Sequence, residues 1–153
     1  GIFLAERLFG AVLVNRDALM DAYREIFKLA GFGLGGVLKK TGELAWKQGI
    51  KHIKEQFAVD TESLDDVITG LSSITVESGM AKNVEWDGDS RQIYIQGSLM
   101  AQAIETSKRP VCYPLSGFIK GFVNEFAGTA MDVEEIQCQA QGHPCCTFQL
   151  KGK

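Results

Sequence analysis

A cluster of cysteines near the carboxyl end constrains the fold of this chain more than any other feature. All four cysteines of the 153-residue sequence lie between Cys112 and Cys146, and three of them surround a turn that contains Gly142. Glycine tolerates the positive φ angles that tight turns require. The pattern therefore predicts a β-hairpin whose ends carry sulfur ligands.

The alternation of side chains predicts which face of this hairpin is buried. Residues 136–141 and 146–151 alternate between apolar and polar side chains, so that Ile136, Cys138, Ala140 and Cys146 share the buried face. If the turn is centred on Gly142, Cys138 lies directly opposite Cys146, with Cβ atoms about 4.5–5.5 Å apart. That spacing suits two thiolates on one zinc ion, with Zn–S bonds of about 2.3 Å.

The segment before the hairpin is predicted to be a helix that supplies a third sulfur. Its apolar residues recur at helical spacing, at Leu115, Phe118, Ile119, Phe122, Val123 and Phe126. Cys112 continues this stripe at the start of the helix, where the helix dipole favours a thiolate. Packing of the stripe on the hairpin would bring three sulfurs together.

A carboxylate is the candidate for a fourth ligand, and the spacing leaves two residues open. In a regular strand Glu134 shares the face of Cys138, whereas Glu135 lies on the opposite face. Either Glu134 is the ligand, or a bulge near Ile136 turns Glu135 inward.

The pattern Cys112, Glu135-x-x-Cys138, Gly142, Cys146 and Phe148 resembles the 4-vinyl reductase domain family. This family is related to the sensor domains of phenol-responsive transcription activators and, more remotely, to the vesicle-tethering subunits of the transport protein particle. The resemblance is specific over about the last third of the chain. It implies a structural zinc held by Cys112, Glu135, Cys138 and Cys146, with Cys145 as an extra cysteine on the wet face.

Two other states of the cysteines remain compatible with the spacing. They could be ordinary buried thiols, or Cys138 and Cys146 could form a disulfide. With three thiolates and a carboxylate, a zinc site has no open position and is structural rather than catalytic.

Composition bounds the class of protein. The chain has the length of one domain, residues 1–153, with the zinc-bearing part at about 110–151; it is 45% hydrophobic and 23% charged. The net charge is −3 without a basic run, so we expect no nucleic-acid binding by this domain. No apolar run reaches the length of a membrane span, no signal peptide is recognisable, and clustered cysteines suit a reducing compartment, so we expect a cytoplasmic protein.

Upstream of the cysteines the sequence predicts helices followed by a hairpin. The expected elements are a strand at Leu8–Val14, helices at about 17–31, 34–57 and 61–78, a hairpin at about 84–95 and a loop from Ser98 to Arg109. Asp60 and Thr61 are expected to cap the third helix. The fold class is therefore α+β, with an antiparallel sheet of about four strands plus an amino-terminal strand, packed with four helices.

The glycine-rich run Gly31–Gly36 is not interpreted as a phosphate loop. It follows a helix and lacks the Lys-Ser/Thr pair of such loops. We expect it to connect two helices and to let two backbones approach closely.

Large apolar side chains on facing elements are the candidates for a ligand pocket. They are Trp46, Trp86, Phe118 and Phe122, with His52 as a polar group beside them. Most of this apolar bulk must form core.

The sequence favours a binding module over an enzyme. Through the family resemblance, the first hypothesis is a sensor domain that binds a small apolar or aromatic molecule. A scaffold like the tethering subunits and a component of a tetrapyrrole 4-vinyl reductase are the alternatives. No hydride-donor site is visible, so we do not expect direct reductase activity. A helix-mediated homodimer fits all three.

Overall fold

The computed structural model describes residues 14–57 and 63–152 as an α+β domain. The elements in chain order are α2 (Arg16–Ala30), η1 (Gly31–Leu34), α3 (Gly35–Phe57), α4 (Leu64–Glu77), β1 (Asn83–Asp87), β2 (Gln92–Gln96), α5 (Leu99–Ile104), α6 (Tyr113–Ala127), β3 (Asp132–Gln137), η2 (Gln139–Gln141) and β4 (Cys146–Lys151). The predicted fold class is confirmed. The expected strand at Leu8–Val14 lies almost entirely outside the described residues.

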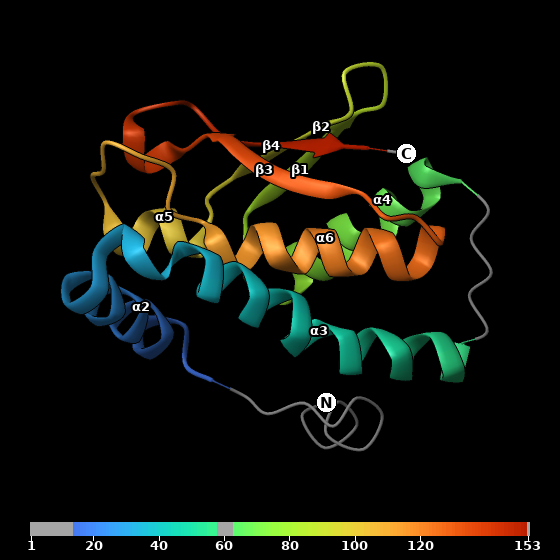
Figure 1. The fold of residues 1–153 in the computed structure, drawn as a ribbon, viewed down its shortest axis with the longest axis horizontal. Coiled ribbons are helices and arrows are strands. Elements are labelled where there is room, and N and C mark those ends of the chain that lie inside the picture. The colour runs from blue at the N-terminus through green and yellow to red at the C-terminus, as the bar shows by residue number, and fades with distance from the viewer. Residues whose placement is uncertain (1–13, 58–62, 153) are drawn as a thin grey trace.

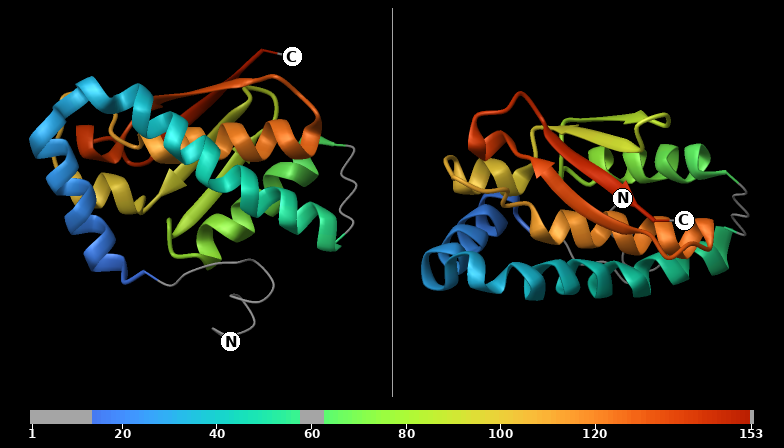
Figure 2. Two further views of the ribbon diagram at one scale, coloured as in Figure 1. Left: turned by 60° about the horizontal axis from the view of Figure 1, so that its bottom comes forward. Right: turned by 45° about the horizontal axis from the view of Figure 1, so that its top comes forward.

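The four strands form one antiparallel sheet in the order β1-β2-β4-β3. The last strand of the chain is thus inserted between the two hairpins, and Ile95 of β2 pairs with Cys146 of β4. Figures 1 and 2 show the sheet on one side of the domain, α6 beneath it and α3 on the far side of α6. The carboxyl-terminal cysteines therefore lie in the middle of the structure.

Helix α6 is the centre of the core. All six residues of the predicted apolar stripe are buried, and Leu115, Phe118, Ile119 and Val123 have no exposed surface. The inner face of the sheet covers them with Ile93, Val133 and Phe148, which are also fully buried. Each such side chain stabilises the fold by about 1.5–3 kcal/mol through removal from water.

Two glycines let α3 and α6 approach to backbone contact. A Cβ added at Gly42 would lie 2.1 Å from the carbonyl oxygen of Pro114, and one at Gly117 would lie 1.8 Å from that of Lys39. The run Gly31–Gly36 connects α2 to α3, as predicted, but the close approach of two backbones occurs at these other glycines. Only a side chain consisting of hydrogen fits at either position.

Several boundaries differ from the sequence prediction. Residues Leu99–Ile104, expected to be loop, form α5, capped by Ser98, whose Oγ accepts a hydrogen bond from the amide of Ala101 at 3.4 Å. Six residues are too few to show a helical period, so the capping serine was the available signal. Helix α4 is capped by Ser63; Asp60 and Thr61 lie outside the described residues. In residues 14–57 and 63–152, no helix is both long and apolar enough to cross a bilayer.

Candidate metal centre

Three cysteine sulfurs meet where α6 begins and the last hairpin closes. Cys112 is the N-cap of α6, Cys138 directly follows β3 and Cys146 opens β4. The sulfur of Cys112 lies 3.9 Å from that of Cys138 and 3.8 Å from that of Cys146, and the latter two are 3.8 Å apart. Tetrahedral coordination with Zn–S bonds of about 2.3 Å requires sulfur separations of about 3.8 Å. The triangle of sulfurs therefore has the dimensions of one face of a tetrahedral zinc site.

Glu135 completes the cluster. One ligand atom from each of Cys112, Glu135, Cys138 and Cys146 lies within 4.8 Å of the other three. The Oε2 atom of Glu135 accepts a hydrogen bond from the amide of Cys112 at 2.8 Å, whereas Oε1 is buried without a hydrogen-bond partner. A buried carboxylate oxygen without a partner is costly unless a cation satisfies it. The residues present thus fit a divalent metal ion.

A β-bulge decides between the two glutamates. The register of β3 against β4 shifts between Glu135 and Gln137, which turns Glu135 towards the sulfurs. Glu134 remains on the exposed side and forms an ion pair with Lys151. Of the two alternatives left open by the sequence, the structure has the bulge.

The same bulge corrects the predicted hairpin. Strand β3 ends at Gln137 and is followed by the 3₁₀ turn η2, so Cys138 lies past the paired region rather than directly opposite Cys146. Ile136, predicted to be buried, is 42% exposed, and Thr147, predicted to face water, is 2% exposed. Simple alternation failed because one inserted residue reverses the face of all that follow.

Hydrogen bonds from neighbouring groups orient the sulfurs. The Ser98 hydroxyl lies 3.2 Å from the sulfur of Cys112, and the amide of Gln139 donates to the sulfur of Cys146 at 3.3 Å. Such outer contacts fix ligand geometry around metals. Sequence analysis missed both residues, because the positions of α5 and η2 depend on the folded chain.

Burial and mutual contact perturb the acidities of the cluster. Burial raises the pKa of the Cys112 thiol well above its ordinary value. Burial, followed by the charge of Cys138, raises the pKa of Glu135 to about 8. Hydrogen bonds from the thiols of Cys112 and Cys146 lower the pKa of Cys138. Without a metal the cluster therefore holds its negative charge mainly on Cys138 and keeps Glu135 protonated at neutral pH.

The cysteines are all free thiols in the structure. The sulfurs of Cys138 and Cys146 are 3.8 Å apart, whereas a disulfide requires about 2.05 Å. Cys145 lies outside the cluster and is half-buried, with its sulfur 3.8 Å from the Thr147 hydroxyl oxygen.

The predicted pocket residues are only partly brought together. Phe118 and Phe122 are adjacent on α6, with ring centroids 5.8 Å apart in an edge-to-face arrangement, and both are buried. Trp86 is half-buried on β1, and its Nε1 donates to Oδ1 of Asp65 on α4 at 2.6 Å. The side chains of Trp46 and His52 lie outside the described part of the structure.

Comparison with known proteins gives a family match for part of the chain. Residues 92–152, which contain the whole sulfur cluster, match the model of the vinyl-4-reductase (V-4-R) domain. No curated protein sequence matches the chain.

Three solved structures have the same fold. The phenol-responsive sensory domain of the transcription activator PoxR, solved with phenol, has a TM-score of 0.70 at 16% identity and aligns over 92% of this chain and 75% of its own. A vinyl-4-reductase family protein from Methanocaldococcus jannaschii has 0.62 at 17%, with 98% and 88% covered. Trafficking protein particle complex subunit 3 from Naegleria fowleri, covalently bound to palmitic acid, has 0.66 at 15%, with 90% and 96% covered.

At these identities the structural neighbours establish the fold alone. The resemblance predicted from the cysteine pattern is confirmed: residues 92–152 match the vinyl-4-reductase domain, and the chain as a whole has the fold of the sensory, vinyl-4-reductase and trafficking-complex proteins.

Proposed function

We propose that this domain senses a small hydrophobic molecule and that a structural zinc ion holds its carboxyl-terminal hairpin rigid. The observation that carries the sensing role is the shared fold with the PoxR sensory domain, whose structure contains phenol. The trafficking subunit of the same fold carries palmitic acid. Two neighbours with apolar molecules favour the same class of ligand here.

Zinc is the metal that the donor set favours. Three thiolates and one carboxylate suit zinc, because soft sulfur ligands exclude magnesium and calcium. Four protein ligands leave no position for water or substrate, so the ion is structural. We assign Cys112, Glu135, Cys138 and Cys146 as its ligands. Free thiols of this kind persist in a reducing compartment, which favours the cytoplasm.

The ligand site that we propose lies among the apolar side chains of α6 and the elements beside it. Phe118 and Phe122 provide an aromatic wall within the core. Trp86 offers a further ring on β1. Trp46 and His52 are proposed from the sequence only. Apolar walls with few polar groups are typical of pockets for small aromatic molecules.

Native mass spectrometry of the purified protein tests both parts of the proposal. We expect one zinc ion per chain and either a co-purified apolar molecule or saturable 1:1 binding of added phenol or palmitic acid. Phe122→Leu should weaken ligand binding more than Phe126→Leu, a matched change one turn further along α6. Intact zinc-loaded protein that binds no apolar probe would refute the sensing role but not the metal site.

A scaffold role is the second candidate, favoured by exposed apolar side chains on α2 and α3. Leu29 is 88% exposed, and Val37 and Leu44, seven residues apart on one face of α3, are 59% and 51% exposed. Clustered apolar exposure of this kind is typical of protein interfaces. We propose that these helices pair in a homodimer.

Light scattering tests the dimer. The double change Val37→Glu and Leu44→Glu should convert a dimer to a monomer, because a charge cannot be buried without a partner. Val76→Glu, at a similarly exposed apolar residue on α4, should leave the mass unchanged. A monomeric wild-type protein at high concentration would exclude this arrangement.

A further inference from the structure

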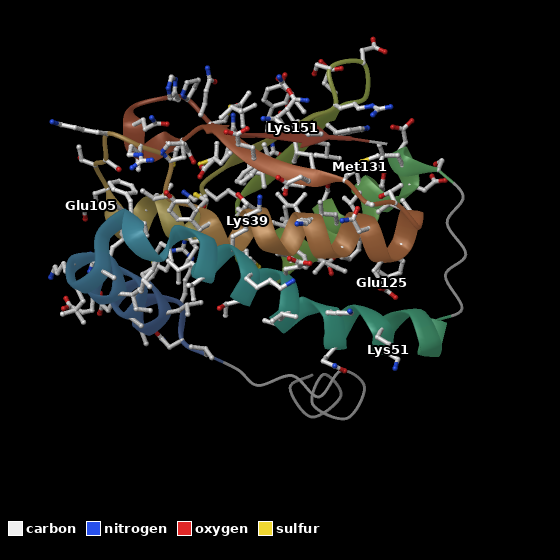
Figure 3. All side chains as sticks on the ribbon, in the orientation of Figure 1. Lys39, Lys51, Glu105, Glu125, Met131 and Lys151 are labelled. Atoms are coloured by element: carbon white, nitrogen blue, oxygen red, sulfur yellow. The ribbon has the colours of Figure 1, made fainter. Side chains whose placement is uncertain are left out.

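A cleft lies next to the candidate metal centre. It encloses about 470 Å³ between α3, the first turn of α6, β3 and the segment before α6. Its lining includes Lys39, Arg109, Tyr113, Ser116, Glu135 and Ile136. Figure 3 shows Lys39 on α3 beside α6, and its Nζ reaches Oδ1 of Asp132 at 2.9 Å.

Only one of the four candidate ligands lines this cleft. Glu135 forms part of its wall, whereas the cysteines at 112, 138 and 146 have no exposed surface. The Oε2 atom of Glu135 is held by the amide of Cys112, and Oε1 has no hydrogen-bond partner. A molecule that reaches the cluster without unfolding it must therefore arrive on the side of Glu135.

We propose that this cleft is the route by which the metal enters and leaves, and that Glu135 is the ligand that gives way to a small chelating molecule. The inference rests on the zinc site proposed above. In the exchange, a donor atom of the incoming molecule forms a bond to the metal while the bond to the Glu135 carboxylate breaks. The carboxylate leaves with its electron pair, and no group is oxidised or reduced.

The charges around the cleft favour an anionic chelator. Lys39 is paired with Asp132, and Glu134 is paired with Lys151. The ion pairs found among the described residues do not include Arg109, whose guanidinium lies over the ring of Phe32, 4.9 Å from its centroid. An uncompensated cation at the cleft attracts anions and raises the rate of encounter.

Ile136 offers a way to change the cleft without touching a ligand. Its side chain lies on the cleft wall and is 42% exposed, so a larger or smaller residue fits there without disturbing the core. Ile136→Trp should narrow the route and Ile136→Ser should widen it. Val76, 40% exposed on α4 and away from the cleft, provides matched controls as Val76→Trp and Val76→Ser.

The experiment measures transfer of zinc from the loaded, full-length protein to EDTA, an anionic chelator, and to 1,10-phenanthroline, a neutral one. We expect the rate to rise in proportion to chelator concentration, to fall several-fold in Ile136→Trp and to rise several-fold in Ile136→Ser. Both Val76 variants should match the wild type. Arg109→Gln should slow extraction by EDTA and leave extraction by phenanthroline unchanged.

Two further measurements keep the result unambiguous. The absorption spectrum of the cobalt-substituted protein should be the same in all variants, which shows that the ligand set is intact. Rates independent of chelator concentration, or rates that follow the free energy of unfolding rather than the width of the cleft, would overturn the route while leaving the zinc site in place. Protein that binds no metal at all would overturn both.

Discussion

Cys138 and Cys145 have the same side chain and lie close together in the sequence, but only Cys138 contacts the other sulfurs. It is fully buried, 3.9 Å and 3.8 Å from the sulfurs of Cys112 and Cys146. Cys138→Ser should abolish stoichiometric metal binding and lower the free energy of unfolding by about 4 kcal/mol or more, because loss of a structural metal is among the largest single-residue effects.

Cys145→Ser is the matched control. Its sulfur contacts only the Thr147 hydroxyl among the contacts described, so the change should stay within about 0.5 kcal/mol. Urea denaturation with elemental analysis measures both variants. Equal losses in the two would show that the wrong thiol has been assigned to the metal.

Glu135 gives the metal affinity a dependence on pH. Burial is the main cause that raises its pKa to about 8, so in the metal-free protein it is protonated at pH 7. A metal must displace that proton, and the apparent affinity should therefore rise as the pH increases from 6 to 8. In Glu135→Gln the affinity should be lower and its slope against pH shallower by up to one proton.

Competition titrations with a zinc indicator at several pH values measure that slope. Glu134→Gln serves as the comparison, because it removes only an exposed ion pair with Lys151, worth about 0–1 kcal/mol. The same slope in wild type and Glu135→Gln would remove this carboxylate from the metal site.

At the scale of elements, the contact between α3 and α6 depends on glycine rather than on apolar area alone. A methyl group at Gly117 would lie 1.8 Å from the carbonyl oxygen of Lys39, so one helix would have to move. Gly117→Ala should lower the free energy of unfolding by about 1–3 kcal/mol or more, as overpacking does elsewhere.

Gly49, inside α3, is the control for this change. A Cβ there meets no atom within 4 Å, and alanine favours a helix over glycine by about 0.5–1 kcal/mol. Gly49→Ala should therefore raise the thermal midpoint while Gly117→Ala lowers it. Stability gained in both variants would mean that the helices do not touch as described.

Across the whole molecule, the candidate ligands join three separate parts of the chain: the start of α6, the end of β3 and the start of β4. Cys112 and Cys146 are 34 positions apart, so a bound ion closes a long loop. Tyr23 of α2 extends the connection, since its hydroxyl donates to the carbonyl of Val111, next to Cys112.

Removal of the metal should therefore loosen the hairpin before the helical layer. After chelation we expect amide hydrogen exchange to accelerate in β3, η2 and β4, while the glycine-packed core of α3 and α6 retains more protection. Added zinc should restore the protection, and the thermal midpoint should rise with zinc concentration. Uniform loss of protection would show that the metal holds the entire fold together.

The sequence by itself determined the identity of the sulfur donors, the buried stripe of α6 and the α+β class, because ligand chemistry and side-chain periodicity are local properties. Only the tertiary structure decided that Glu135 and not Glu134 faces the sulfurs, that Ser98 begins a helix, and that β4 lies between β2 and β3. A single bulged residue reverses the faces of a strand, and its position is set by pairing with distant strands. The same holds for Gly42 and Gly117, whose meaning depends on a helix that crosses from elsewhere in the chain.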